Sequence, residues 1–199
     1  MSRMCKLVVL GDSGVGKTTI IHKYIAEEFR ADFKATIGAD FSSKTIQVNG
    51  QQVDLNIWDT AGEERFHSVG ASFYRGVEAV ILVFDITQHE TVEHLKNWKD
   101  DLYQKSGIPT SEEIPMIIFG NKCDLEDQRQ VAPNEVEQIG VLNNIPALEV
   151  SAKSGKNIEE GFKMITELYL KSSDNARKIE SSSITLRVNQ NQNKNQCNC

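Results

Sequence analysis

The chain has 199 residues, of which 39% are hydrophobic and 25% charged, and its net charge is −6. This length allows one domain with a sizeable core and a tail, and the composition is ordinary for a soluble globular protein. The acidic balance argues against nucleic acid as a partner, because binding to a phosphate backbone requires a basic surface. No apolar run approaches the roughly 20 residues that span a bilayer, and we recognise no signal peptide, so we expect a cytosolic chain.

Short apolar runs alternate with helical patterns along most of the chain. Strands are predicted at Lys6–Leu10, Phe41–Val48, Gln52–Trp58, Ala79–Asp85, Pro115–Gly120 and Ala147–Val150. Helices are predicted at Lys17–Glu28, Glu90–Gln104 and Ile158–Leu170. Asn49-Gly50 separates the second and third strands and is a strong hairpin signal. The alternation predicts an α/β fold with a doubly wound, mostly parallel sheet of six strands, one of them antiparallel.

The composition changes near residue 172. Residues 181–196 read SSSITLRVNQNQNKNQ and are rich in Ser, Asn and Gln. Such a segment buries too little apolar surface to offset the entropy lost on ordering. We therefore predict a folded domain at residues 1–171 and a flexible tail at residues 172–199, whose tether spans roughly 25–30 Å root-mean-square.

The stretch GDSGVGKT, Gly11–Thr18, matches the phosphate-loop pattern G-x-x-x-x-G-K-[ST] and lies between a predicted strand and a predicted helix. Gly14 and Gly16 allow backbone N–H groups to wrap around a phosphate. Lys17 places a positive charge near the β and γ phosphates, and Thr18 offers a hydroxyl to Mg²⁺. The alternative is a plain glycine-rich connection, which the later motifs disfavour. Kinases, ATPases and GTPases all use such a loop, so the base must be read elsewhere.

A candidate base reader, Asn121-Lys122-Cys123-Asp124, directly follows a predicted strand. The Asp124 carboxylate can accept two hydrogen bonds from guanine, whereas adenine offers no matching pair of donors. Sites of this kind discriminate by about 10⁴ or more. Ser151-Ala152-Lys153 follows the last strand, where its backbone can meet the guanine carbonyl and Lys122 can lie along the base. Taken alone, Asn-Lys-x-Asp is equally compatible with a surface turn.

The ordered set of Gly11–Thr18, Thr36, Asp59–Gly62, Asn121–Asp124 and Ser151–Lys153 resembles the Ras superfamily of small GTPases. A finer pattern is similar to the Rab branch, and ATIGADF with SVGASFYRG is most similar to its late-endosomal and vacuolar subgroup. The stretches that carry it are Ile37–Phe41, Trp58–Phe66, Phe73–Gly76 and Leu82–Thr87. The resemblance implies a P-loop GTPase fold, GTP, GDP and Mg²⁺ as ligands, and a hydrolytic switch in vesicular membrane traffic.

The resemblance also implies roles for individual residues. Thr18, Thr36 and Asp59 would hold Mg²⁺, and Gly62 would meet the γ phosphate, so that both switch loops are ordered only while that phosphate is present. The implied catalytic set is Glu63, Lys17, Thr36 and Gly62. The implied nucleotide-binding set is Ser13, Gly14, Val15, Gly16, Lys17, Thr18, Thr19, Phe29, Phe33, Thr36, Gly62, Asn121, Lys122, Asp124, Ser151, Ala152 and Lys153.

Several aromatic residues have two interpretations. Phe29 either packs edge-on against guanine or belongs to the core. Phe33 stands where many relatives carry Tyr, so a hydroxyl over the phosphates is missing. Ile37, Phe41, Trp58 and Phe73 resemble a partner-binding surface, with ordinary core packing as the alternative. Trp98 is predicted to pack within a helix, and the four His residues are predicted on the surface or on helices.

Glu63 is the main departure from the family pattern, which has Gln at this position. An ionised Glu accepts hydrogen bonds but cannot donate them, and it places a negative charge near the phosphates. Two unit charges 5 Å apart repel by about 3 kcal/mol at an effective dielectric of 20. A carboxylate can also polarise the attacking water, so we expect hydrolysis at an altered intrinsic rate. The alternative is a GTP-locked, weakly catalytic scaffold that recruits effectors, and a P-loop metabolite kinase is a third, disfavoured reading.

The chain ends in Gln196-Cys197-Asn198-Cys199, which is similar to the doubly geranylgeranylated Cys-x-Cys end of Rabs. Two lipids anchor stably where one gives only marginal binding. A chance pair of exposed Cys is the alternative. The implied partners are an exchange factor, a GTPase-activating protein, a prenylation escort, a GDP-dissociation inhibitor and effectors. We expect a monomer on the cytoplasmic face of endosomal, lysosomal, vacuolar or phagosomal membranes, with an inhibitor-bound cytosolic pool.

Overall fold

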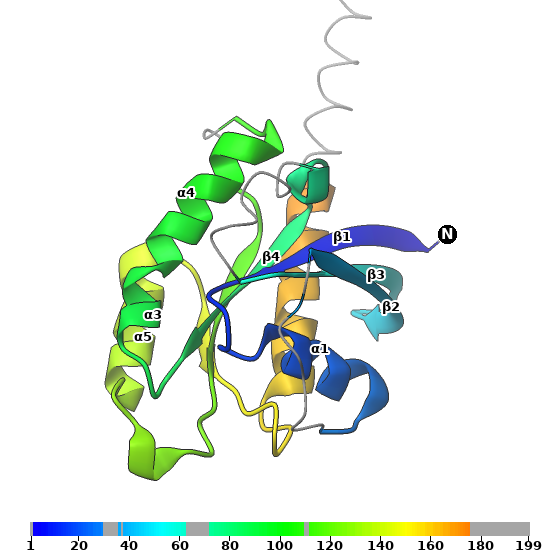
Figure 1. The fold of residues 1–199 in the computed structure, drawn as a ribbon. Coiled ribbons are helices and arrows are strands. Elements are labelled where there is room, and N and C mark those ends of the chain that lie inside the picture. The colour runs from blue at the N-terminus through cyan, green and yellow to red at the C-terminus, as the bar shows by residue number, and fades with distance from the viewer. Residues whose placement is uncertain (1, 30–35, 37, 63–71, 110–111, 176–199) are drawn as a thin grey trace, which may run out of the picture.

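A computed structural model of the protein describes residues 2–29, 36, 38–62, 72–109 and 112–175. Its centre is a six-stranded sheet in the order β2-β3-β1-β4-β5-β6 (Figure 1). The strands are β1 (Arg3–Leu10), β2 (Ala39–Val48), β3 (Gln51–Thr60), β4 (Ala79–Asp85), β5 (Met116–Asn121) and β6 (Ala147–Glu149). The β2–β3 pair is antiparallel and the other pairs are parallel, which confirms the predicted fold class.

The β2–β3 hairpin turns at Asn49-Gly50, as predicted from the sequence. Both residues have positive φ, 52° and 75°. A two-residue turn of this kind matches the twist of the flanking strands, and Asn-Gly is its preferred sequence. The turn fixes the register in which Phe41 lies opposite Trp58.

Helices cover both faces of the sheet (Figure 1). On one face, α1 (Lys17–Ala26) and the helix at residues 158–175 share a core cluster with β1, β3 and β4. On the other face, α4 (Leu95–Ser106) and α5 (Pro133–Asn143) pack against β4 and β5. Every residue of β4 and β5 is buried. Continuous apolar runs are typical of parallel strands covered on both faces.

The prediction of one continuous helix at Glu90–Gln104 is wrong. This segment divides at His94 into α3 (Glu90–Glu93) and α4. The prediction missed α5 altogether, because its exposed Val141 and Leu142, at 81% and 85% exposure, interrupt the amphipathic pattern. Within the described ranges, no helix combines the length and the apolar character needed to cross a bilayer.

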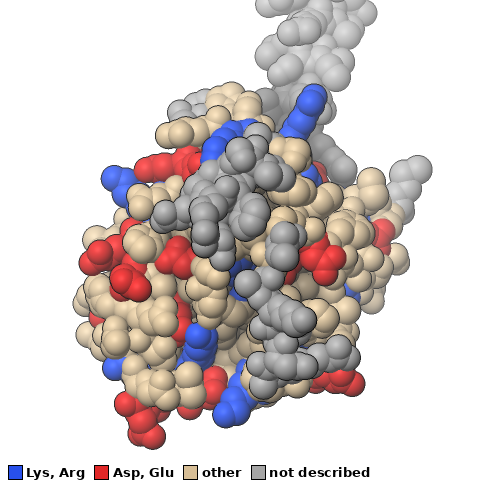
Figure 2. Space-filling model, viewed as in Figure 1, with Lys and Arg blue, Asp and Glu red and all other residues tan. Residues whose placement is uncertain are grey.

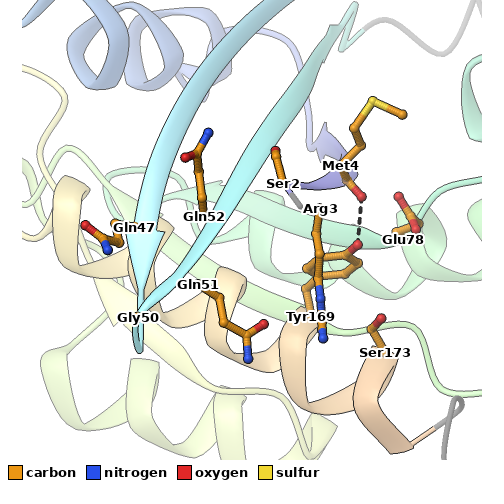
Figure 3. A pocket seen from close by; sticks show the side chains of 10 residues that line it. All are labelled: Ser2, Arg3, Met4, Gln47, Gly50, Gln51, Gln52, Glu78, Tyr169 and Ser173. Carbon is orange, nitrogen blue, oxygen red and sulfur yellow. Dashed lines mark hydrogen bonds between the residues drawn. The ribbon is translucent and has the colours of Figure 1, made fainter.

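The last helix extends five residues beyond the predicted Leu170, to residue 175. Its end is tied to the start of β1 beside a cavity of about 900 Å³ (Figure 3). The Tyr169 hydroxyl donates to the Met4 carbonyl at 2.7 Å, and Arg3 pairs with Asp174 at 2.7 Å. These contacts join the two ends of the folded part of the chain. The division into a domain at 1–171 and a tail at 172–199 stays a prediction.

The close packing of Gly161 against Phe119 allows us to predict the effect of one substitution. A Cβ on Gly161, in the last helix, would lie 2.4 Å from Cζ of Phe119, which is fully buried. Gly161→Ala should therefore lower the free energy of unfolding by about 1–3 kcal/mol through overpacking. Chemical denaturation measures this, with Glu160→Ala as the control at an exposed neighbour. Equal stability of the two variants would contradict this packing.

Candidate functional site

The carboxyl ends of the parallel strands bring the four motifs to one edge of the sheet. The phosphate loop follows β1, Asp59–Gly62 spans the end of β3, Asn121–Asp124 begins at the last residue of β5, and Ser151–Lys153 follows β6. Ligands of open α/β sheets bind at this edge. Acidic and basic side chains are interspersed on the face shown in Figure 2.

The phosphate loop requires glycine at its bends. Gly14 and Gly16 have φ of 78° and 98°, a region that other residues rarely adopt. A Cβ on Gly16 would also lie 2.4 Å from Asn121 Nδ2. Helix α1 begins at Lys17, within the Gly11–Thr18 motif. Its unpaired N–H groups and dipole favour an anion at this point.

Lys17, the first residue of α1, is only 5% exposed. Its ammonium donates to the carbonyls of Gly11 and Asp12, each at 2.7 Å. Burial lowers the Lys17 pKa to about 8, although the charges of Asp59 and Asp12 oppose this shift. A phosphate bound in the loop would favour the charged form.

Three oxygen-bearing side chains converge beside Lys17. The Thr18 hydroxyl donates to Asp59 at 2.5 Å and lies 2.8 Å from the Thr36 hydroxyl, which is 3.4 Å from Asp59. Among the described residues, the buried Asp59 Oδ1 has no hydrogen-bond partner. Burial raises the Asp59 pKa, while the Thr18 hydrogen bond and the Lys17 charge oppose that rise. These hard oxygen donors fit Mg²⁺, which usually takes few protein ligands and completes its shell with phosphate and water.

Gly62 lies directly against the phosphate loop. A Cβ at this position would be 2.3 Å from the Asp12 carbonyl carbon and 2.3 Å from the Ser13 nitrogen. A side chain here would therefore collide with backbone that cannot move aside. The contact places Gly62, two residues after β3, beside Asp12 and the exposed Ser13 of the loop.

Asn121 joins three motifs through one side chain, which is 1% exposed. Its Nδ2 donates to the Val15 carbonyl at 2.8 Å, and its Oδ1 accepts the Ala152 N–H at 3.1 Å. The base-reading loop, the phosphate loop and the Ser151–Lys153 turn are thereby held in one arrangement.

The remaining base-reading side chains are also held by specific partners. The Ser151 hydroxyl donates to Asp124 Oδ1 at 2.6 Å and accepts the Ser154 N–H at 3.0 Å. Lys122 pairs with Asp85 Oδ2 at 2.5 Å, and Asp85 is fully buried. Asp124 itself is exposed, so its carboxylate is oriented by Ser151 and open to solvent.

Phe29 is 42% exposed, which argues against the core interpretation. Thr19 is half-buried on α1, and Lys153 is exposed beside the buried Ala152. Phe33, Ile37, Glu63, Cys197 and Cys199 lie outside the described residues, so their roles remain predictions.

The three described aromatics of the expected partner surface do lie together. The ring centroids of Phe41 and Trp58 are 5.4 Å apart, and those of Trp58 and Phe73 are 5.8 Å apart. Phe41 is 51% exposed, and the Lys6 ammonium lies 4.8 Å from the centre of the Trp58 ring. Core packing is therefore only a partial account of this group, which faces both the core and solvent.

Sequence reasoning missed the contacts of Asp12 and Asp85. Asp12 accepts the Trp98 indole N–H at 2.7 Å and lies 2.6 Å from His94 Nδ1. These partners are 82 and 86 residues away in sequence, and Asp12 occupies a variable position of the phosphate-loop pattern. No local signal in the sequence could have revealed them.

Comparison with known proteins agrees with this geometry. The model of the Ras family matches residues 6–171. The chain is 37% identical to the Ras-related protein RABG3f of Arabidopsis thaliana, covering 98% of this chain and 97% of that one. It is 39% identical to the Ras-related protein Rab7 of Drosophila melanogaster (98% and 96%). It is also 39% identical to the Ypt/Rab-type GTPase YPT7 of Saccharomyces cerevisiae (83% and 81%). The chain therefore belongs to the Ras family, as a Rab GTPase of the late-endosomal and vacuolar subgroup.

Proposed function

We propose that this protein is a GTP/GDP-regulated switch in membrane traffic to late endosomes, lysosomes, vacuoles or phagosomes. The observation that carries the proposal is the convergence, at one sheet edge, of Lys17, the Thr18–Thr36–Asp59 cluster and Asp124. A charged phosphate chain, a divalent cation and a guanine base each find matching groups there. The enzyme hydrolyses GTP to GDP and phosphate.

The residues divide the work of binding and hydrolysis. Backbone N–H groups of Ser13–Gly16 and the Lys17 ammonium bind the phosphates, while Thr18, Thr36 and Asp59 hold Mg²⁺. When bound, Mg²⁺ neutralises charge that develops on the phosphates. Thr36 and Gly62 contact the γ phosphate and release their loops when it leaves. Phe29, Asn121, Lys122, Asp124 and the Ser151–Lys153 turn hold the base, and the role that we assign to Glu63 is to act on the attacking water.

The proposed partners follow from the GTP-bound and GDP-bound states of the switch. Effectors bind Ile37, Phe41, Trp58 and Phe73 when GTP orders the switch loops. An exchange factor and a GTPase-activating protein set the rates of the cycle, and a GDP-dissociation inhibitor holds a cytosolic pool. Lipids on Cys197 and Cys199, added with the help of a prenylation escort, anchor a monomeric chain to the cytoplasmic face of the membrane.

The first prediction concerns the choice of base. Asp124→Asn exchanges one carboxylate acceptor for an amide donor, so guanine loses one of its two hydrogen bonds at this residue. The affinity for GDP should fall about a hundredfold or more, measured by titration calorimetry. Affinity for xanthosine diphosphate, which carries a carbonyl in place of the amino group, should rise. Asp127→Asn, in the neighbouring 3₁₀ turn, is the control and should leave both affinities unchanged.

The second prediction concerns Glu63. The Glu63→Gln variant removes the negative charge and restores a hydrogen-bond donor. It should raise the single-turnover hydrolysis rate of bound GTP about tenfold, which is less than a full repulsion of about 3 kcal/mol would allow. The wild-type chain should still release γ phosphate measurably. The Glu64→Gln variant removes the same charge from the neighbouring residue, and it is the control for an effect of net charge alone. A slower Glu63→Gln variant would mean that the carboxylate acts as a base, and no phosphate release from the wild type over days would support the scaffold alternative.

The third prediction concerns the membrane. The doubly substituted variant Cys197→Ser/Cys199→Ser should move from the membrane fraction to the cytosol. Each single variant should remain only partly in the membrane fraction. Intact-mass spectrometry of the chain from its native cell should find two isoprenoid additions. An unmodified chain in the membrane fraction would overturn the proposed anchor.

A further inference from the structure

The side chain of Asp12, the second residue of the phosphate loop, contacts two residues at the start of α4. The Trp98 indole N–H donates to its Oδ1 at 2.7 Å, and His94 Nδ1 lies 2.6 Å from its Oδ2. His94 immediately precedes α4, and Trp98 follows one turn later, so both residues face the loop from one side of the helix. Both oxygens of one carboxylate thus have a partner on a single helix end.

The backbone of Asp12 faces the nucleotide machinery instead. Its carbonyl accepts the Lys17 ammonium at 2.7 Å. Gly62 lies against the same peptide, where a Cβ would be 2.4 Å from the Asp12 oxygen. One residue therefore links α4 through its side chain to Lys17 and Gly62 through its main chain.

The helix side of this link is firmly anchored. Trp98 is 6% exposed and belongs to the core cluster that contains Leu95 and Leu102. The Asp12 side chain is mostly covered, whereas the His94 side chain is 41% exposed at the rim. Hydrogen bonds to a charged acceptor are shorter and stronger than neutral ones. A buried indole that donates such a bond restricts where the loop can move.

We propose that Asp12 is a positioning residue for nucleotide binding, and that Trp98 and His94 brace the phosphate loop through its carboxylate. The inference rests on the proposed function, because it requires phosphates to bind in this loop. A loop that already has its binding shape loses less freedom when the ligand arrives. The brace therefore slows nucleotide release, although Asp12, Trp98 and His94 need not touch the nucleotide.

The test measures release of a fluorescent GDP analogue from the full chain, in excess GDP and Mg²⁺. Asp12→Ala should speed release about tenfold or more, because both carboxylate contacts are lost. Asp12→Asn should stay within about threefold of wild type. Its amide oxygen still accepts from Trp98, and its NH₂ can donate to His94 Nδ1 in the tautomer that leaves this nitrogen without a proton. Tyr103→Phe, which removes a hydroxyl near the other end of α4, is the control and should leave the rate unchanged.

A merely structural role for these bonds predicts a different pattern. In that case the variants would lower the melting temperature but release nucleotide at the wild-type rate, which would overturn the inference. The indole N–H resonance of Trp98 in the GDP-bound protein, assigned with Trp98→Phe, gives a second readout. It should shift strongly in Asp12→Ala and little in Asp12→Asn.

If Asp12→Ala does not fold, Trp98→Phe removes the principal donor and should also speed release. Rescue is the decisive comparison, so release from Asp12→Asn as fast as from Asp12→Ala would overturn the brace. Failure of the wild-type chain to bind GDP would overturn the proposed function itself, and the inference with it. Wild-type binding with unchanged release from Asp12→Ala and Trp98→Phe would overturn the inference alone.

Discussion

The arrangement of the site depends on the buried side chain of Asn121. Its amide donates to the phosphate loop at Val15 and accepts from Ala152, so loops that follow β1, β5 and β6 share one anchor. Gly16 has no side chain at the point where Asn121 approaches, because a Cβ there would collide with its amide. A buried amide that lost these partners would carry the full cost of desolvation. Asn121 thereby holds the phosphate loop, the Asn121–Asp124 loop and the Ser151–Lys153 turn in one relative arrangement.

The phosphate end of the site balances opposite charges in a buried setting. Burial lowers the Lys17 pKa and raises that of Asp59, and each charge partly offsets the shift of the other. Phosphates and a divalent cation restore the charged forms that burial disfavours. The Thr36 hydroxyl contacts both Thr18 and Asp59 in this cluster.

Strand β3 connects the Thr18–Thr36–Asp59 cluster to the Phe41–Trp58–Phe73 aromatic group through the alternation of its side chains. Trp58 faces Phe41 and Phe73, and the next residue, Asp59, faces Thr18 on the opposite side of the sheet. A shift of the strand end would move both groups together. Helix α4 is also linked to the end of β3 through Asp12. Trp98 donates to the Asp12 carboxylate, and Gly62 lies against the Asp12 peptide. The end of β3 thus lies between the Gly11–Thr18 loop and the Phe41–Trp58–Phe73 aromatic group.

The sequence by itself determined the sheet class and the Asn49-Gly50 hairpin, and it indicated the motifs that we propose for phosphate, metal and base. It could do so because glycine spacing, apolar runs and polar residues at strand ends are local features. The break at His94 and the existence of α5 followed from packing that no local pattern records. Only the tertiary structure decided that Asn121 bridges three loops, that Asp85 pairs with Lys122, and that Asp12 is held from α4. These contacts join residues far apart in the chain, and their geometry exists only once the sheet has aligned its carboxyl ends.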